Sequence, residues 1–474
     1  MYDRSEMKMP RQSRSRFHEY YGCPEETARF VSPVELPQNQ GFFGLGNGTV
    51  CYGRCLSGTV QQLDGPCPPD ALPAVQFQDA SARLPFDLDE IVDNLRLERY
   101  AAGSSVRHAG FADPFLRSLY YLVRPYLSDW VRGRIKRFVL RGWEQIRFPN
   151  WPVDTTVEDL MKEVLRLALK GNPAARIPFI WFWPDGAAGA IIMTHDVETA
   201  RGRDACAHLM DIDDSFGIKS SFQVVPEERY EVDRDFLDSI VQRGFELNVQ
   251  DLNHDGRLFE NHAQFQQRAA LINRHLADFP AQGFRAGVLY RNLDWLSALN
   301  IAYDMSVPNV AHLDPQRGGC CTVMPYFIGD ILELPLTTTQ DYMLFDILRD
   351  YSMDLWKTET EAILAHNGLA SFLVHPDYLR TRGEELLYEE LLDYLRSVAS
   401  ERNAWIALPS QVNQWWRERS EMKLIRDGSG WKVQGAGSGR ARVAYATLSG
   451  NEVVYEVDPR PVQKQAFTVS SFSD

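Results

Sequence analysis

The sequence has few positive charges for its length. Its 474 residues include 50 Lys and Arg against 64 Asp and Glu, which gives a formal net charge of −14. Nucleic-acid binding needs clustered Lys and Arg to neutralise phosphates, so we expect no nucleic-acid partner. One basic stretch, "RGRIKRFVLRGW" (residues 132–143), has apolar residues at helical spacing. We interpret it as a solvated helix face; a surface that docks a partner or a membrane is the alternative.

Long apolar runs are also missing. Residues 1–22 have no apolar segment of the kind that a signal peptide needs, and no later stretch approaches the roughly 20 residues that span a membrane. We therefore expect a protein with no integral membrane segment that is located in the cytoplasm.

Cysteine pairs and nucleotide-binding motifs are lacking too. The chain has 7 Cys, an odd number, and none of them forms a C-x-x-C pair. Cys51 and Cys55 are separated by three residues, but no second pair completes a zinc site, so we predict reduced structural thiols. No G-x-G-x-x-G or Walker motif follows any apolar run, which argues against a nucleotide-binding domain.

The arrangement of apolar residues changes along the chain. From about residue 175, short apolar runs alternate with helical segments, beginning with a run at residues 178–183. Such alternation over more than 200 residues is typical of a parallel sheet or a β/α barrel. Near residue 420 it gives way to alternating strands broken by "DGSG" and "SGN", which predict hairpins. The predicted segments are an irregular arm (1–40), an α+β region (41–174), a β/α barrel (175–419) and a small antiparallel β unit (420–474).

One helix before the barrel has clear end signals. Thr155 and Glu158 have the spacing of a capping box, and Gly171 follows an apolar helical face. We therefore predict a helix between these residues.

Residues suited to catalysis gather where the apolar runs end. The stretch "AIIMTHDVETARG" (residues 190–202) ends a run with His195, Asp196 and Glu198. Other runs are followed by, or contain, further residues of this kind: Gln250, His254, Arg285, Asp304 and His375. In a β/α barrel the carboxyl ends of the strands meet at one face, which carries the chemistry. Five strand ends therefore predict one shared site.

Spacing sharpens this prediction but leaves alternatives open. Asp196 and Glu198 point to the same side of an extended strand, where two carboxylates repel unless a cation or proton lies between them. Gln250 and His254 are four residues apart and share one face of a helical turn. The structural alternatives are surface charge for the carboxylates, an ion pair for Arg285 and a core histidine for His375.

With these positions in hand, residues 189–416 resemble the polysaccharide deacetylase superfamily, carbohydrate esterase family 4. "THDVE" is similar to the family motif T-F-D-D-G, "FRAG" to the motif that carries an arginine, and "FLVH" to the motif that carries a histidine. "NIAYDMS", around Asp304, resembles the strand of a further motif. The resemblance implies Asp196 as the catalytic base, Arg285 as the residue that orients it and His375 as the general acid.

The departures from the family pattern fall on the metal ligands. The family's second aspartate is Val197 here, so Glu198 offers a displaced carboxylate. "ELNVQDLNHD" resembles the H-x-x-x-H-P motif, with His254 at the second histidine and Gln250 at the first. The resemblance thus implies a divalent metal, zinc above all, held by Glu198, His254 and Gln250. Asp196, His195 and His312 are further candidate ligands.

The expected fold is α/β: a distorted (β/α) barrel of the polysaccharide deacetylase type, with an N-terminal α+β extension and a small C-terminal antiparallel β unit. The expected function is metal-dependent hydrolysis of the N-acetyl group of an amino sugar in a surface-polysaccharide or glycoconjugate precursor. This reaction makes the protein a hydrolase of carbon–nitrogen bonds other than peptide bonds, with an N-acetylated saccharide as its partner. The alternatives are an inactive barrel that binds saccharide, and a metal hydrolase that acts on a different bond.

Overall fold

The central feature of the fold is a curled, mostly parallel sheet. A computed structural model of the chain describes residues 15–63, 67–102, 140–172, 176–428 and 430–459. Within these ranges nine strands form one sheet, in which only the β12–β13 pairing is antiparallel. The strands are β7 (Ala190–Val197), β8 (Ser221–Val224), β9 (Glu246–Gln250), β10 (Gly283–Arg285), β11 (Tyr303–Asp304), β12 (Tyr326–Ile328), β13 (Ile331–Glu333), β14 (Leu369–Leu373) and β15 (Trp405–Ile406). This is the predicted α/β class.

The two edges of the sheet are joined through side chains. The strands run in the order β12-β13-β11-β10-β9-β8-β7-β14. The segment after β13 lies beside β14, where Thr337 Oγ1 donates to the Leu369 carbonyl (2.7 Å) and Thr338 Oγ1 donates to the Ser371 carbonyl (2.8 Å). Threonine hydroxyl groups therefore join the segment after β13 to β14. The sheet curls into the distorted barrel that was expected from the sequence.

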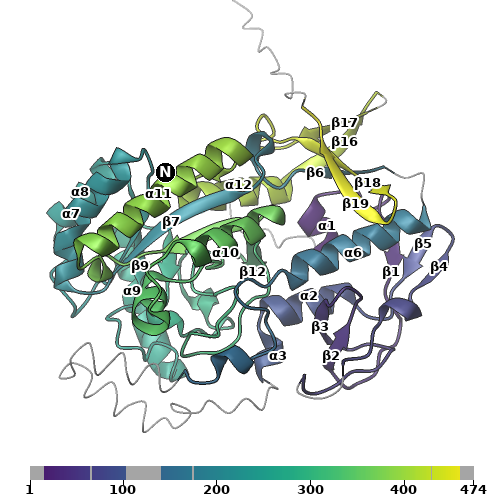
Figure 1. Cartoon of the computed structure of the whole chain (residues 1–474), viewed down its shortest axis with the longest axis horizontal. Helices are drawn as coiled ribbons and strands as arrows, with labels where there is room; N and C mark the ends of the chain where they lie inside the picture. The colour runs from purple at the N-terminus through teal and green to yellow at the C-terminus, as the bar shows by residue number, and fades with distance from the viewer. Residues whose placement is uncertain (1–14, 64–66, 103–139, 173–175, 429, 460–474) are drawn as a thin grey trace, which may run out of the picture.

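Helices cover the outer face of the barrel. They are α7 (Ala200–Ser215), α8 (Arg234–Gln242), α9 (His262–Asp278), α10 (Asp354–Ala365), α11 (Arg382–Arg402) and α12 (Pro409–Glu421). Figure 1 shows α7, α8 and α11 together on one side of β7. Ile191, Met193 and Val197 of β7 share an apolar cluster with Leu209 of α7 and Leu391 of α11. Alternate residues of β7 therefore face the helices, as the period of a strand requires.

The remaining elements pack together beside the barrel. The N-terminal elements (purple) and the C-terminal strands (yellow) lie on the same side in Figure 1. One apolar cluster contains buried residues of both, for example Phe17 and Val443. These elements are α1 (Arg16–Tyr21), β1 (Phe30–Val31), β2 (Gly41–Gly44), β3 (Val50–Gly53), β4 (Gln76–Gln78), β5 (Ser81–Arg83), α2 (Leu88–Arg96), α3 (Arg99–Ala102), α6 (Thr156–Gly171), β6 (Ile177–Ile180), β16 (Lys423–Asp427), β17 (Gly430–Gln434), β18 (Val443–Ser449) and β19 (Glu452–Val457).

Strand β6 differs from the prediction. The run at residues 178–183 was expected to open the strand–helix alternation of the barrel. Instead β6 pairs antiparallel with β18 at the edge of a separate sheet ordered β19-β18-β6. Pro178 has no backbone N–H to donate, and proline within a strand is confined to such edges. The two predicted C-terminal hairpins are present as β16–β17 and β18–β19.

Two local predictions near the N-terminus were wrong. Within the arm expected to be irregular, Ser15 caps helix α1, which buries Phe17, Tyr20 and Tyr21. Burial of these aromatic side chains stabilises the packed helix, whereas an irregular arm would leave them exposed to solvent. The predicted capping box is also absent, because Glu158 is buried and accepts from the backbone N–H of Val323 (3.2 Å). Helix α6 nevertheless covers the expected residues. The division of the chain into four segments stays a prediction.

Other sequence predictions can be placed briefly. All seven cysteines are free, and all but Cys67 are buried. Most of the basic stretch at residues 132–143 lies outside the described residues. In the ranges that the structure describes, no helix combines the length and apolar character needed to cross a membrane.

Candidate active site

Asp196 lies at the centre of the candidate site, near the end of β7. Arg285 of β10 donates from Nη1 to Asp196 Oδ1 (2.8 Å), and Gln250 of β9 donates from its amide to Asp196 Oδ2 (2.8 Å). Arg285 also donates to the hydroxyl of Thr194 (3.0 Å) and to the carbonyl of Met305 (3.0 Å). Both oxygens of this carboxylate are therefore fixed by charged or polar donors from β9 and β10, the second and third strands along the sheet from β7.

Glu198 lies one residue beyond β7, between two histidines. Its Oε1 is 3.0 Å from His254 Nε2 and 3.8 Å from His375 Nε2. The side chains of Asp196, His254 and His375 are 3% exposed or less, whereas that of Glu198 is 16% exposed. Glu198 is thus the member of this group that is most open to solvent.

His375 is held in position by Asp341. The backbone N–H of His375 donates to Asp341 Oδ2 (2.7 Å), and its ring Nδ1 lies 2.6 Å from Asp341 Oδ1. A carboxylate only accepts, so Nδ1 carries a proton and Nε2 is the atom that faces Glu198. Burial lowers the pKa of His375, but the charge and hydrogen bond of Asp341 outweigh it and raise this pKa to about 9.

Gln250 and His254 do not share a helical turn as predicted. Gln250 is the last residue of β9, and the chain then turns through left-handed conformations at Asp251 (φ 53°) and His254 (φ 52°). This path directs Gln250 to Asp196 and His254 to Glu198. The spacing of four residues therefore arises from a tight loop rather than from a helix.

A loop after β10 packs directly against this turn. A Cβ atom on Gly287 would lie 2.4 Å from Asp251 Oδ2 and 3.1 Å from His254 Cδ2. Contacts this short mean that a side chain at position 287 would displace Asp251 or His254. The loop and the turn thus fix one another beside the site.

Three of the candidates from the sequence lie outside this group. His195 is fully buried on the opposite side of β7, with Nδ1 near the Val374 carbonyl (2.8 Å) and Nε2 near Asp213 (3.3 Å). His312 stacks on Trp151 with ring centroids 6.1 Å apart. Asp304 accepts from Ser306 (2.6 Å), whose hydroxyl oxygen also accepts from the backbone N–H of Ala286 (2.8 Å). His195 and His312 are therefore not additional ligands at this site, and Asp304 supports the strand that carries Arg285.

The site contains part of a ligand set for a divalent cation. In the described part of the chain, no three His, Cys, Asp or Glu side chains form a ligand group. Val197, at the family's second aspartate position, lies in the apolar cluster under the helices. However, Gln250 Oε1 and His254 Nδ1 are buried without hydrogen-bond partners, and His254 Nε2 makes no well-formed hydrogen bond although it lies 3.0 Å from Glu198 Oε1. Glu198 and His254 thus bring one carboxylate and one imidazole together, and the amide oxygen of Gln250 is a further buried donor without a partner.

Asp341 is the residue at the site that the sequence did not reveal. It follows the "TTTQ" segment, two residues beyond Thr339. Since that segment joins the barrel through threonine hydroxyls, no apolar alternation marks Asp341 as a strand end. A carboxylate after a Thr-rich stretch was the only available signal.

Comparisons with known proteins are limited to folds. No family model matches the chain, and no curated protein matches it. Solved structures that match include a protein from Mycobacterium smegmatis described as a polysaccharide deacetylase, at 19% identity and a TM-score of 0.43, covering 52% of this chain and 97% of the other.

Two further matches have lower identity. The PuuE allantoinase is 12% identical, with a TM-score of 0.39 and coverage of 50% of this chain and 92% of its own. A protein from Pseudomonas aeruginosa PAO1 described as a polysaccharide deacetylase is also 12% identical, with a TM-score of 0.39 and coverage of 50% and 93%. Likenesses at these TM-scores say nothing about activity, which depends on the site itself.

Proposed function

We propose that the protein is a hydrolase that removes the N-acetyl group from an amino sugar. The observation that carries this proposal is the fixing of Asp196 by Arg285 and Gln250 beside the Glu198–His254–His375 group. A base, a charged residue that orients it and a histidine with its own carboxylate are together what amide hydrolysis needs. The expected substrate is a surface-polysaccharide or glycoconjugate precursor in the cytoplasm, carried on a nucleotide or a lipid.

Each residue has a separate task. Asp196 accepts a proton from the attacking water, because each carboxylate oxygen retains a lone pair beyond the bond that fixes it. Arg285 keeps that carboxylate oriented. His375 Nε2 delivers a proton to the leaving amine, while Asp341 holds Nδ1. These three residues are thus already in position to stabilise the charge that develops in the transition state.

Glu198, His254 and Gln250 Oε1 would hold a divalent cation, which would supply polarisation of the acetyl carbonyl. Zinc is the ion expected from the sequence resemblance, and imidazole is a donor that suits it. The two oxygen donors suit harder ions such as Mg²⁺ or Mn²⁺ as well. Elemental analysis of protein purified without added metal distinguishes these ions.

Acetate release from N-acetylated amino-sugar oligomers tests the proposal. The replacement Asp196→Asn is expected to lower kcat by about 10²–10⁴-fold, the typical contribution of a general base. Asp393→Asn is the matched control, because Asp393 is a largely exposed aspartate on α11. Arg285 is fully buried, so circular dichroism must show that Asp196→Asn still folds. Unchanged turnover in a folded Asp196→Asn protein would contradict the role of Asp196.

An inactive barrel that binds saccharide is the second candidate, favoured by Val197 and Gln250 at two positions where the related motifs have metal ligands. It predicts binding of an acetylated oligomer with no acetate release, even after Zn²⁺, Mn²⁺ or Mg²⁺ is added. A bound metal together with acetate release excludes it.

A further inference from the structure

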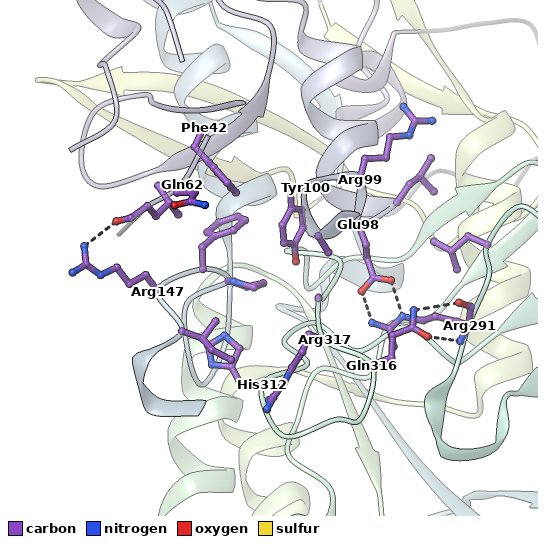
Figure 2. A pocket seen from close by; sticks show the side chains of 18 of the residues that line it. Phe42, Gln62, Glu98, Arg99, Tyr100, Arg147, Arg291, His312, Gln316 and Arg317 are labelled. Atoms are coloured by element: carbon purple, nitrogen blue, oxygen red, sulfur yellow. Dashed lines mark hydrogen bonds and ion pairs between the residues drawn. The ribbon is translucent and has the colours of Figure 1, made fainter. Parts of the chain in front are cut away.

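A large cavity lies between the N-terminal elements and the loops of the barrel. Its volume is about 750 Å³, within the range of roughly 300–1,000 Å³ of sites that enclose small ligands. The loops after β10 and β11 supply Arg291, His312 and Arg317. Figure 2 shows Phe42 across the cavity from His312 and Arg317, and Phe148 also lines the cavity. Both loops follow carboxyl ends of barrel strands, so the cavity opens at the same end of the barrel as Asp196.

The cavity is positively charged in an acidic protein. Its lining contains four arginines and two acidic residues, although the chain as a whole has a net charge of −14. One of those acids, Glu98, is already paired with Arg291, whose Nε donates to Glu98 Oε2 (2.7 Å). Within the lining, Asp294 is the acid that remains beside the other three arginines, and the charge of Asp314 also acts on Arg317; the remaining excess of positive charge favours an anionic ligand.

Arg317 is the cation best placed to bind that ligand. Its Nη1 is buried and has no hydrogen-bond partner within the described ranges. Burial lowers the pKa of Arg317, opposed by the charge of Asp314, and burial also raises the pKa of Asp314 itself to about 7. A buried guanidinium without a full counter-charge is costly. Its planar set of N–H donors matches a carboxylate or a phosphate.

His312 lies beside Arg317, and its uncharged imidazole ring can bind a neutral polar group of a ligand. It is 2% exposed, and neither ring nitrogen makes a well-formed hydrogen bond, although the Pro149 carbonyl is close enough to favour the charged ring. Burial, followed by the charge of Arg317, lowers the pKa of His312 to about 4. The neutral ring therefore has one N–H donor and one acceptor, which is the pattern that a sugar hydroxyl complements.

Aromatic side chains also line the cavity. Phe148 packs edge to face with Tyr100 (5.0 Å between ring centroids) and with Phe42 (5.8 Å). Rings held in this way give a rigid apolar surface at low entropic cost. The C–H face of a sugar ring is a suitable partner for such a surface.

One short loop of the chain has residues at both the candidate active site and the cavity. Gly287 touches the Asp251–His254 turn, and Arg291 follows it by four residues. The Cα atoms of Gly287 and Arg291 are therefore no more than about 14 Å apart. Arg291 also donates to the Leu289 carbonyl within this loop (2.9 Å), which fixes the connection.

We propose that this cavity binds a saccharide that carries an anionic group, with the anion on Arg317, a hydroxyl on His312 and a sugar ring against the Phe148 wall. Resting on the proposed function, this assigns the substrate class: an acidic or phosphate-linked glycan whose anionic part lies away from the acetyl group that is removed. The N-terminal region then forms half of the substrate site.

Calorimetric titration with three probes tests this assignment. The probes are UDP-N-acetylglucosamine for phosphate, a hyaluronan tetrasaccharide for carboxylate, and neutral N-acetylchitotriose. At least one anionic probe should bind wild-type protein more tightly than the neutral one. Arg317→Gln should weaken that probe about 10–100-fold, which is the value of a charged hydrogen bond, and the neutral probe by less than about 2-fold. The tighter anionic probe identifies phosphate or carboxylate as the source.

Matched variants control for charge and folding. Arg396→Gln makes the same charge change at an exposed residue of α11 that pairs with Asp393 and lies over the Phe216 ring, and should bind as wild type does. Arg317→Lys keeps the charge without the planar donor set and should give an intermediate affinity. Arg317→Gln removes a charge that Asp314 offsets only in part, so its melting temperature should match or exceed that of wild type, which excludes loss of binding through unfolding.

Three results would overturn the proposal: equal affinity of wild type and Arg317→Gln for the anionic probe, equal affinity of wild type for neutral and anionic probes, or no binding of any probe at millimolar concentration.

Asp196→Asn separates this proposal from the proposed function, because it should lose turnover and retain probe binding. If wild-type protein binds but releases no acetate, the proposed function fails and the cavity assignment stands.

Discussion

Gln250 donates its side-chain amide to Asp196 over 2.8 Å, at a position where the related family motif has a metal-binding histidine. The amide thus orients the base with one of its ends and leaves Oε1 buried without a partner at the other. A histidine here could not fill both roles with the same geometry. Gln250 therefore both orients Asp196 and supplies a donor atom for the proposed cation site.

Gln250→Met should lower kcat more than it changes KM. Methionine has a similar length but no amide, so Asp196 loses one of its two fixing bonds. The loss of one such hydrogen bond amounts to about 0.5–1.5 kcal/mol, or roughly 2–10-fold in kcat. Steady-state kinetics check this, with thermal melting to confirm the fold. A rise in KM at constant kcat would show that Gln250 binds substrate instead of positioning the base.

Val197→Asp should destabilise the protein rather than restore a metal ligand. Val197 is fully buried and lies in the apolar cluster with Leu209 and Leu391. A carboxylate in that cluster has no partner, and burying it costs at least about 3 kcal/mol. Urea unfolding measures the loss, and Val197→Ala controls for the change in volume. Normal stability together with an increase in bound zinc would contradict this prediction.

Asp341→Asn should reduce kcat by acting through His375. Asparagine cannot neutralise the imidazolium, and its amide presents N–H groups where Asp341 accepts two bonds. We expect a decrease of about 10–100-fold. The decisive measurement is a double-mutant cycle with His375→Gln, on which background Asp341→Asn should have little further effect. Additive effects would mean that Asp341 works independently of His375.

Glu359→Gln should change how stability depends on pH. Glu359 is fully buried, and burial raises its pKa to about 8 against two hydrogen bonds from Thr339. The unfolded chain titrates near pH 4.3, so the folded state binds the extra proton between these values and stability falls as pH rises from about 4 to 8. Glutamine mimics the protonated acid. The variant should match wild type at pH 4 and exceed it by on the order of 1–4 kcal/mol at pH 9.

Urea unfolding of both proteins at pH 4, 6 and 9 measures this difference. Glu361→Gln serves as the control for the loss of one carboxylate on the same helix, because Glu361 is half exposed and pairs with Arg402 at the surface. A constant difference between Glu359→Gln and wild type across the pH range would show that Glu359 is ionised in the folded state at every pH.

The positions of Asp196, Arg285 and His375 were predictable because parallel strands deliver their carboxyl ends to one face. The orientation of His195 was also available from the strand period, which places it on the side of β7 opposite to Asp196. The turn between Gln250 and His254 was not predictable, since it depends on left-handed conformations at residues with no glycine to signal them.

Packing decided the other differences between sequence and structure. Strand β6 has the apolar composition of a barrel strand, and only its proline hinted at an edge. Glu158 had the spacing of a helix cap, but the loop at Val323 provides a stronger set of donors in the interior. Neither choice can be made from local sequence, because each depends on a partner more than 160 residues away.

The pairing of β6 with β18 also constrains how the chain is made and folded. The barrel strands lie between these two partners in sequence, so the barrel is in effect an insertion within the small β19-β18-β6 sheet. During synthesis β6 leaves the ribosome more than 260 residues before the first residue of β18 does. Until then its apolar edge has no partner and is exposed to aggregation or to a chaperone. The barrel can assemble first, and the small sheet closes the molecule last.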